Sequence, residues 1–397
     1  MVATLTQEAA RARAVVAVFP QGRRVLTALP TLWPHMLLPR LRSGPRPYPL
    51  AEREVRPFYF ARNAVWLGAR LLGLAGHEVL VPAYHHGVEV EALEAAGAKP
   101  RFVRVDGKMR LDVEDMERKI GPRTRALYVI HYNGFAQPMD DVMAVARRHA
   151  LPVVEDCALS LLACDGEAPL GARGDLAVFC LYKTIPVPNG GLLVMNRPFD
   201  APWPARGAPV GSTLSHAAGL LLAHAAWRYG PAGEAFRESV RRTHRAVRFA
   251  TGVHALATGS MHFDPAAADV GMSPLSRLVM EHQDWDGIVE ARRRNWFLLH
   301  ARLREFAPPL QHELPPGACP LFYPLLVEDK AEVAARLAAR GIETVEFWNT
   351  GHPACDLSEF PEVGALRRRV LELPLHQDLG PEDMAYLATA VEEALSP

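Results

Sequence analysis

Short apolar runs alternate along the middle of the chain with segments whose apolar residues recur at helical spacing. The runs that read as buried strands are "HEVLVPAY", "KPRFVRV", "RALYVIHYNG", "LPVVEDCA", "DLAVFCLY" and "GLLVMN". The segments that read as helices are "NAVWLGARLLGLAG", "GVEVEALEAAGA", "VEDMERKI" and "DDVMAVARRHA". Strands that alternate with helices in this way predict βαβ units and a mostly parallel sheet covered on both faces.

The pattern changes toward both ends of the chain. Residues 285–306 predict one long helix, which is suited to bridge two domains. After it, "PLFYPLLVED", "KAEVAARLAARG" and "IETVEFW" predict strand, helix and strand, and "PEDMAYLATAVEEALS" predicts a closing helix. Residues 200–260 carry weak strand signals and read as mostly helical or irregular. We therefore expect an N-terminal arm (1–54), a large α/β domain (55–284) and a smaller C-terminal α/β domain (285–397).

Composition limits the classes of function. The chain has 397 residues, and Lys+Arg and Asp+Glu both number 44, so its zero net charge gives no general attraction to nucleic acid. Its five cysteines form no C-x-x-C pair, which favours reduced thiols in a cytoplasmic protein over a disulfide framework or a metal site. We read no signal peptide at the N-terminus. The apolar stretch 217–230 is too short to cross a bilayer. It predicts a core helix, or else a helix that lies against a membrane or a partner.

Polar side chains follow the carboxyl ends of the predicted strands, where open α/β sheets bind their ligands. They are His85, His86, His131, Tyr132, Asn133, Glu155, Asp156 and Lys183. A lysine and a carboxylate on separate strand ends, with rings nearby, suit pyridoxal 5′-phosphate (PLP), which needs an amine for its Schiff base and an acid for its pyridine nitrogen. The alternative for a lysine just past a strand is that its ammonium group simply reaches water.

Four stretches carry a family resemblance, in order, through most of residues 55–395. They begin "HEVLVPAYHHG", "TRALYVIHYNG", "GDLAVFCLYKT" and "LELPLHQDLGPED". Together they resemble the DegT/StrS-type aminotransferases, many of which act on nucleotide-linked keto-sugars. The resemblance implies a PLP fold-type I enzyme, with a mostly parallel central sheet in the large domain and a smaller C-terminal domain.

The resemblance also implies roles for single residues. Lys183 matches the Schiff-base lysine and Asp156 the acid that faces the pyridine nitrogen. His86 matches the ring that stacks on the cofactor, although a loop histidine making a hydrogen bond is the alternative. Ala61, Arg62 and Asn63 match the phosphate cradle, and backbone amides at a helix N-terminus are suited to an anion. The alternative for Asp156 is a helix N-cap.

Several positions depart from the family pattern. Leu159 stands where the family has a glutamine near the phenolic oxygen of the cofactor. We expect Asn133 to replace that glutamine, as an asparagine does in aspartate aminotransferases, unless it only caps the turn at Gly134. Cys180 stands in place of a serine near the phosphate, and a thiol is a weak donor. The family segment that reaches the neighbouring subunit is reduced here to "GMSPLSR" (271–277).

These observations predict an aminotransferase. The resemblance implies transfer of an amino group from glutamate or glutamine to a keto or aldehyde acceptor, with a keto-sugar nucleotide as the first choice, in a homodimer. The alternatives are a PLP-dependent sugar dehydratase, against which the retained Lys183 counts, and a PLP-binding protein without turnover. Arginines cluster at 241–248 and 292–294 and could bind a diphosphate, although charge runs on helices are usually solvated faces.

Overall fold

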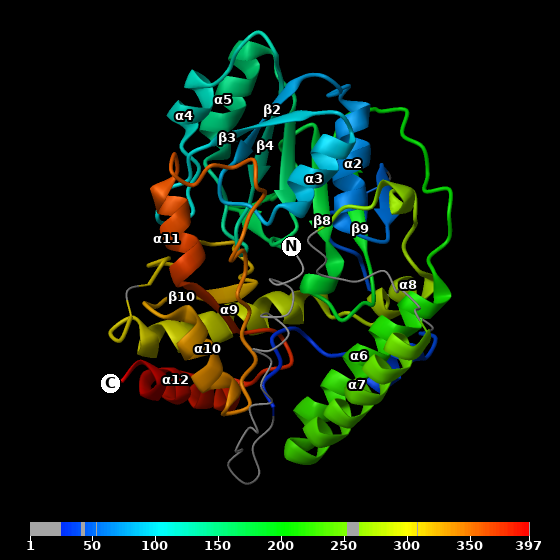
Figure 1. Ribbon diagram of the computed structural model, residues 1–397, viewed down its shortest axis with the longest axis vertical. Coiled ribbons are helices and arrows are strands. Elements are labelled where there is room, and N and C mark those ends of the chain that lie inside the picture. Colours follow the sequence, from blue (N-terminus) through cyan, green and yellow to red (C-terminus); the bar gives the residue numbers. More distant parts are fainter. Residues whose placement is uncertain (1–24, 41–43, 53, 252–261, 308, 397) are drawn as a thin grey trace.

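A seven-stranded sheet with the strand order β1-β9-β8-β5-β4-β2-β3 forms the centre of the large domain (Figure 1). The computed structural model describes residues 25–40, 44–52, 54–251, 262–307 and 309–396, with the side chains of 244–251 left out. The strands are β1 (Val55–Phe58), β2 (Glu78–Pro82), β3 (Lys99–Val103), β4 (Thr124–Ile130), β5 (Val153–Cys157), β8 (Leu176–Cys180) and β9 (Gly191–Met195). A short hairpin, β6 (Cys164–Asp165) and β7 (Ala168–Pro169), stands apart from the sheet.

The sheet is mostly parallel, as the alternating pattern predicts. The pairs β2–β3, β2–β4, β4–β5 and β5–β8 are parallel, and β9 runs antiparallel to both β8 and β1. Every residue of β2, β5, β8 and β9 is buried, which explains their continuous apolar runs. Strand β1 was not predicted, because Arg56 and Pro57 separate its apolar residues Val55 and Phe58. The α/β fold class is confirmed.

Four helices follow the strands of the sheet in the order of the chain. They are α2 (Ala61–Leu71), α3 (Val88–Ala95), α4 (Val113–Arg118) and α5 (Met139–His149). Helix α2 packs on α3 and lies against β8 and β9. A Cβ atom at Gly68 would lie 3.3 Å from Leu176 and 3.4 Å from Leu193, so the small residue lets α2 approach the sheet. This helix therefore has a fixed position relative to the strand ends.

The C-terminal residues form a smaller unit below the sheet in Figure 1. Its elements are α9 (Trp285–Leu303), β10 (Phe322–Leu326), α10 (Lys330–Ala338), α11 (Pro361–Arg369), β11 (Val370–Pro374) and α12 (Pro381–Leu395). The predicted strand at 342–348 is wrong, because β10 pairs antiparallel with β11 instead. Residues 342–348 make only isolated bridges, at Ile342 and Val345, and Trp348 takes a left-handed φ of 57° that ends any extended run.

The segment 200–260 contains two long helices that pack on each other. They are α6 (Val210–Tyr229) and α7 (Pro231–Thr251), and α8 (Pro274–Met280) follows them. The stretch 217–230 falls at the end of α6, where Ala217, Ala226 and Trp227 are buried. Across the described ranges, no helix combines the length and apolar character needed to span a membrane. Short 3₁₀ turns occur at η1 (Pro34–Leu37), η2 (Leu181–Lys183) and η3 (Pro265–Ala267).

Candidate active site

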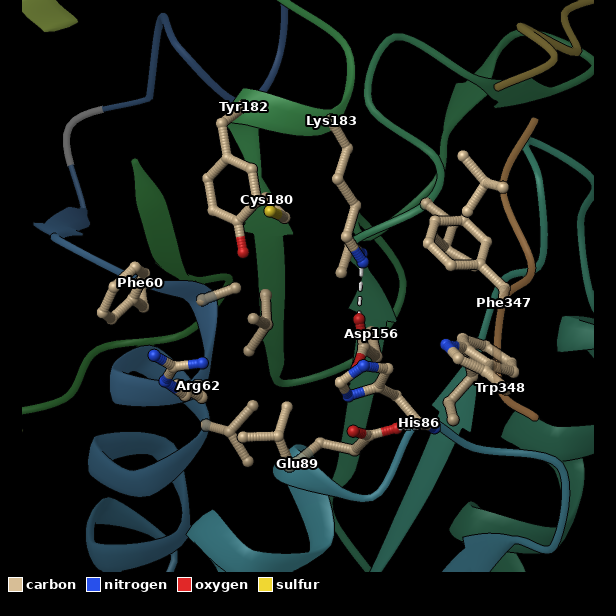
Figure 2. A pocket seen from close by; sticks show the side chains of 18 of the residues that line it. Phe60, Arg62, His86, Glu89, Asp156, Cys180, Tyr182, Lys183, Phe347 and Trp348 are labelled. Atoms are coloured by element: carbon tan, nitrogen blue, oxygen red, sulfur yellow. Dashed lines mark hydrogen bonds between the residues drawn. The ribbon is translucent and has the colours of Figure 1, made fainter. Parts of the chain in front are cut away.

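A cavity of about 330 Å³ opens at the carboxyl ends of β4, β5 and β8 (Figure 2). This is where parallel α/β sheets place their ligands. Its polar and aromatic lining residues are Phe60, Arg62, His86, Glu89, Asp156, Cys180, Tyr182, Lys183, Phe347 and Trp348. Lys183, Asp156 and His86 lie in the middle of the view, between Arg62 on one side and Phe347 and Trp348 on the other. Six of the sequence-predicted residues thus meet in one cavity: Ala61, Arg62, His86, Asp156, Cys180 and Lys183.

Lys183 is the last residue of the 3₁₀ turn that follows β8. Its side chain extends toward Asp156, and Nζ lies 5.4 Å from the centre of the Phe347 ring. The backbone is fixed directly after the lysine, because the Thr184 carbonyl accepts hydrogen bonds from Arg292 and from Gln377, each at 3.1 Å. The ammonium group is therefore held inside the cavity rather than extended into bulk water.

Asp156 is buried near the end of β5. The Tyr128 hydroxyl donates to Oδ2 at 2.6 Å, and the Ala158 amide donates to Oδ1 at 2.9 Å. Burial raises the pKa of Asp156, and the charge of Glu89 raises it further, while these two hydrogen bonds oppose the rise. No helix follows β5 directly, so Asp156 does not act as a helix N-cap. The carboxyl group is suited to share a proton with a ring nitrogen in the cavity.

His86 lies on the loop between β2 and α3. Burial, with the nearby charges of Lys183 and Arg62, lowers its pKa to about 4, so the imidazole is a neutral flat ring at pH 7. Its Nδ1 is buried and has no hydrogen-bond partner in the described part of the chain. Glu89 holds the loop by accepting from the backbone N–H groups of His86 (2.8 Å) and Gly87 (3.1 Å). The geometry favours a ring that stacks on a ligand over a histidine that only makes a hydrogen bond.

The N-terminus of α2 lies at the other side of the cavity and is suited to bind an anion. Phe60 is the N-cap of this helix and provides no side-chain cap, and Ala61 and Arg62 line the cavity. The Arg62 guanidinium lies 3.9 Å from the centre of the Phe60 ring, which adds a full positive charge to the helix dipole. Asn63 does not line the cavity, because its side chain donates to the Ala267 carbonyl at 2.8 Å and its backbone N–H to Phe60. The structure therefore leaves Asn63 out of the cradle.

Cys180 ends β8 and is buried at the same cavity. Burial raises the pKa of its thiol, so it stays protonated and can offer only a weak S–H donor. All five cysteines are free. No group of three or more histidine, cysteine or acidic side chains among the described residues is arranged to hold a metal ion.

The structure does not support the predicted role of Asn133. Its φ of 50° is left-handed, and its side-chain amide donates to both carboxylate oxygens of Glu372, at 3.0 and 3.2 Å. It therefore faces the small domain and does not line the cavity, whereas Leu159 does. Neither residue presents an amide to the cavity, so Asn133 does not take the place of the family's glutamine in this structure. The pattern of residue types alone could not show this, because the backbone angle decides where the side chain goes.

Several lining residues were missed by the sequence analysis. Glu89 was hidden in a predicted helix, although an acid in the first turn of a helix is a capping signal that could have drawn attention to it. Leu29 comes from the N-terminal segment, and Val345, Phe347 and Trp348 from the segment predicted as a strand. These four residues reach the cavity only through the tertiary fold.

The arginines at 292–294 hold the backbone together and do not line the cavity. The side chain of Arg292 is buried and donates to the carbonyls of Thr184, Pro320 and Leu321. Arg293 donates to the Pro315 and Ala318 carbonyls. In the other cluster, Arg242 pairs with Glu238, and the side chains of Arg245 and Arg248 lie outside the described residues. A diphosphate-binding role finds no support at 292–294.

The residues present fit PLP. The cavity offers a lysine amine, a buried acid that shares its space, a neutral flat ring, and a helix N-terminus with an added cation. Its volume lies within the usual range of about 300–1,000 Å³ for small-ligand sites.

Comparison with known proteins agrees with this reading. Residues 61–201 match the sequence model of the DegT/DnrJ/EryC1/StrS aminotransferase family. A UDP-N-acetyl-3-dehydro-alpha-D-glucosamine 3-aminotransferase of Acidithiobacillus ferrooxidans is 25% identical over 349 residues, which cover 84% of this chain and 82% of that protein. A GDP-perosamine synthase of Vibrio cholerae is 31% identical over 137 residues, 34% of this chain, and the chain spans only 37% of its length.

Solved structures share the fold. A Streptococcus pneumoniae chain, assigned as a sugar aminotransferase and solved in its PLP form, has a TM-score of 0.62 and 17% identity, covering 86% of this chain and 88% of that one. At this identity the likeness shows the fold alone. It places the chain among proteins with the α/β architecture described above.

Proposed function

We propose that this chain, which belongs to the DegT/DnrJ/EryC1/StrS aminotransferase family, transfers an amino group from glutamate or glutamine to the keto carbon of a nucleotide-linked keto-sugar. The observation that carries the proposal is the meeting of Lys183 and Asp156, from neighbouring strand ends, in a cavity that also holds a neutral ring and a cationic helix N-terminus. The relatives named for keto-sugar amination support the acceptor class.

Each residue has a distinct task in this proposal. PLP, when bound, supplies an aromatic ring that accepts electrons from the carbon being deprotonated. Lys183 Nζ would hold the cofactor and, when it is free, could move a proton at the reacting carbon. Asp156 would keep a proton on the ring nitrogen, from a buried position in which electrostatic interactions are strong. Arg62 and the first amides of α2 would hold the phosphate, and the neutral imidazole of His86 would offer a flat surface to the ring.

The assembly and location of the protein are part of the proposal. We expect a homodimer, as in other fold-type I enzymes, and a PLP-loaded active monomer in sedimentation experiments would contradict this. The five free cysteines support a reducing, cytoplasmic compartment.

One experiment separates an aminotransferase from a PLP-binding protein without turnover. Purified protein should carry the yellow absorbance of lysine-bound PLP, and glutamate or glutamine should bleach it. Adding a keto-sugar nucleotide should then restore the band and release an aminated sugar, detected by mass spectrometry, while keto acids and simple aldehydes serve as comparison acceptors. A yellow protein whose band no amine donor changes would contradict amino transfer.

A further inference from the structure

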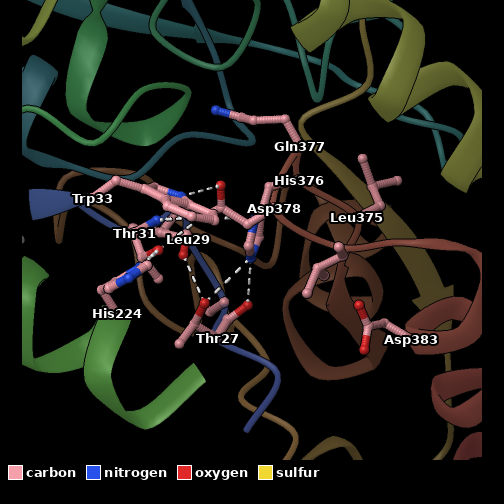
Figure 3. Close-up of polar contacts among 12 residues, drawn as sticks. Thr27, Leu29, Thr31, Trp33, His224, Leu375, His376, Gln377, Asp378 and Asp383 are labelled. Carbon is pink, nitrogen blue, oxygen red and sulfur yellow. Dashed lines mark hydrogen bonds and ion pairs between the residues drawn. The ribbon is translucent and has the colours of Figure 1, made fainter. Parts of the chain in front are cut away.

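The N-terminal segment Thr27–Trp33, here called the strap, contacts His376 and Asp378 near the C-terminus (Figure 3) and contributes Leu29 to the cavity. It begins where Leu26 exchanges backbone hydrogen bonds with the small domain, from Leu26 N–H to Gly341 (2.9 Å) and from Glu343 N–H back to Leu26 (2.8 Å). Thr27 and Thr31 are buried, and the partly buried Leu29 between them lines the cavity. The strap therefore brings an apolar side chain to the site from outside the large domain.

One carboxylate holds the far end of the strap. Asp378 Oδ2 accepts from the backbone N–H of Thr31 at 2.7 Å and from the Thr31 hydroxyl at 2.9 Å. Asp378 Oδ1 accepts from the indole N–H of Trp33 at 3.2 Å. Hydrogen bonds to a charged acceptor are stronger than those between neutral groups, and this carboxylate is only 9% exposed. Three donors from two residues thus fix the strap to the loop before α12.

A histidine holds the near end. The Nε2 of His376 donates to the Thr27 carbonyl at 2.8 Å, because a carbonyl can only accept. The Thr27 hydroxyl donates to the Leu29 carbonyl at 3.0 Å and closes a tight turn. These two contacts fix the backbone on both sides of Ala28 and set the direction of the Leu29 side chain.

The residue between these two anchors connects the strap to Lys183. The Gln377 side chain donates to the Thr184 carbonyl at 3.1 Å and accepts from Arg292 at 3.2 Å. His376 and Asp378 therefore hold the strap, and Gln377 between them holds the backbone next to Lys183. A displacement of the strap and a displacement of the lysine are coupled through three consecutive residues.

The residues that line the cavity from outside the large domain (55–284) are uncharged. They are Leu29, Val345, Phe347 and Trp348, and the cationic residues on the cavity are Arg62 and Lys183 among those the structure describes. Phosphate groups are recognised by arginine and lysine, and none of these four residues is either. Lys183 Nζ lies 5.4 Å from the centre of the Phe347 ring, but in the proposed function this amine holds the cofactor. A ligand group placed here would have to be uncharged and present an apolar face.

We propose that the strap is the acceptor-side wall of the active site, that Leu29 limits the size of the group admitted beside Lys183, and that Asp378 and His376 are the positioning residues. This role rests on the proposed function. It requires that the part of the acceptor nearest the reacting carbon is a compact, uncharged group with an apolar face.

The test uses two reagents of different size on the PLP-loaded protein. Hydroxylamine and O-benzylhydroxylamine both strip PLP from its lysine, and the loss of the cofactor absorbance gives a rate for each. In the wild-type protein the bulky reagent should react more slowly. Leu29→Ala should raise the rate of the bulky reagent about tenfold relative to that of hydroxylamine. This figure is the lower end of the range of about 10–200-fold by which one methylene group changes discrimination in an apolar pocket. Leu29→Met should keep the wild-type ratio.

Two further variants separate positioning from general stability. Asp378→Ala should release the strap and shift the rate ratio in the same direction as Leu29→Ala. Thr31→Val removes the hydroxyl that donates to Asp378 and that also contacts His224 Nδ1 at 3.1 Å, but keeps the backbone N–H donor, so it should shift the ratio less. Leu214→Ala changes an exposed leucine of α6 (58% exposed) and serves as the matched control with an unchanged ratio.

The outcomes distinguish this inference from the proposed function. A folded Leu29→Ala protein with the wild-type ratio would overturn the role of Leu29, and a folded Thr31→Val or Asp378→Ala protein with that ratio would overturn the role of the anchor. Either result leaves the bleaching by glutamate intact. Absence of any PLP band in the wild-type protein would instead overturn the proposed function, and the strap proposal with it.

Discussion

Glu372 provides a direct test of how the two domains are joined. It lies on β11, is 1% exposed, and its carboxylate accepts hydrogen bonds from the Asn133 amide of the large domain. Burial raises its pKa from 4.5 to about 7, against the opposing effects of Asn133 and of the charge on Lys330. Asn133 Oδ1 has no partner in the described part of the chain. The Glu372 carboxylate is thus buried, and its hydrogen bonds offset only part of the cost of removing its charge from water.

Replacing the acid with an amide should stabilise the protein at neutral and alkaline pH. Because the folded state raises this pKa, it binds the proton more tightly than the unfolded state, and the carboxyl reduces stability as the pH rises from about 4.5 to about 7. With about 1.4 kcal/mol per pKa unit, the cost approaches about 3 kcal/mol at pH 8 and is about 1 kcal/mol at pH 5. Glu372→Gln removes this cost, and its new N–H₂ group can also donate to Asn133 Oδ1.

The assay is urea unfolding of both proteins, without added cofactor, at several pH values from 5 to 8. The difference in unfolding free energy between variant and wild type should grow by about 2 kcal/mol over this range. Every other titrating group is common to both proteins, so its contribution cancels in the difference. A difference that does not change with pH, or a variant less stable than wild type at pH 8, would refute the reasoning.

The remaining predictions concern the cavity and the turn at Gly134. Lys183→Ala should abolish the absorbance of lysine-bound PLP and all amino transfer, measured by spectroscopy and by product formation. Asp156→Ala should retain part of the cofactor but lose roughly 10²–10³-fold in turnover, the usual effect of removing one electrostatic group from a preorganised site; near-normal turnover would refute its assignment. Gly134→Ala should destabilise the protein by about 1–3 kcal/mol or more in chemical unfolding, since φ is +85° and the new Cβ would overlap the Cys319 carbonyl oxygen; unchanged stability would contradict this.

The central sheet and half of the site could be predicted because they depend on local pattern. Buried parallel strands produce continuous apolar runs, and the residue that ends such a run is placed at the ligand-binding edge by the strand itself. Asp156 near the end of β5 and Lys183 just after β8 could therefore be brought together from their sequence positions. The N-terminus of α2 follows β1 within three residues, but β1 was not predicted, so the family resemblance and not the strand pattern indicated this part of the site.

The rest of the site could not be predicted, because it depends on backbone angles and distant contacts. Trp348 and Asn133 both take left-handed angles that no residue type demands, and these angles decide which side chains reach the cavity. Leu29 reaches it through contacts with the opposite end of the chain, where His376 holds Thr27 and Asp378 holds Thr31. An apolar residue in a proline-rich arm carries no signal of such a contact.

The reduced segment 271–277 shows how the chain fixes Lys183 by its own contacts. Asn189 precedes the two glycines that end the turn after the lysine, and its Oδ1 accepts from the Ser273 N–H at 2.9 Å while its Nδ2 donates to Ser273 Oγ at 3.0 Å. The Ser276 hydroxyl donates to the Asn189 carbonyl at 2.7 Å. The turn is thus held from one side by this segment, while Gln377 and Arg292 hold Thr184 from the other. The serines that remain in this segment therefore position the lysine within the same chain.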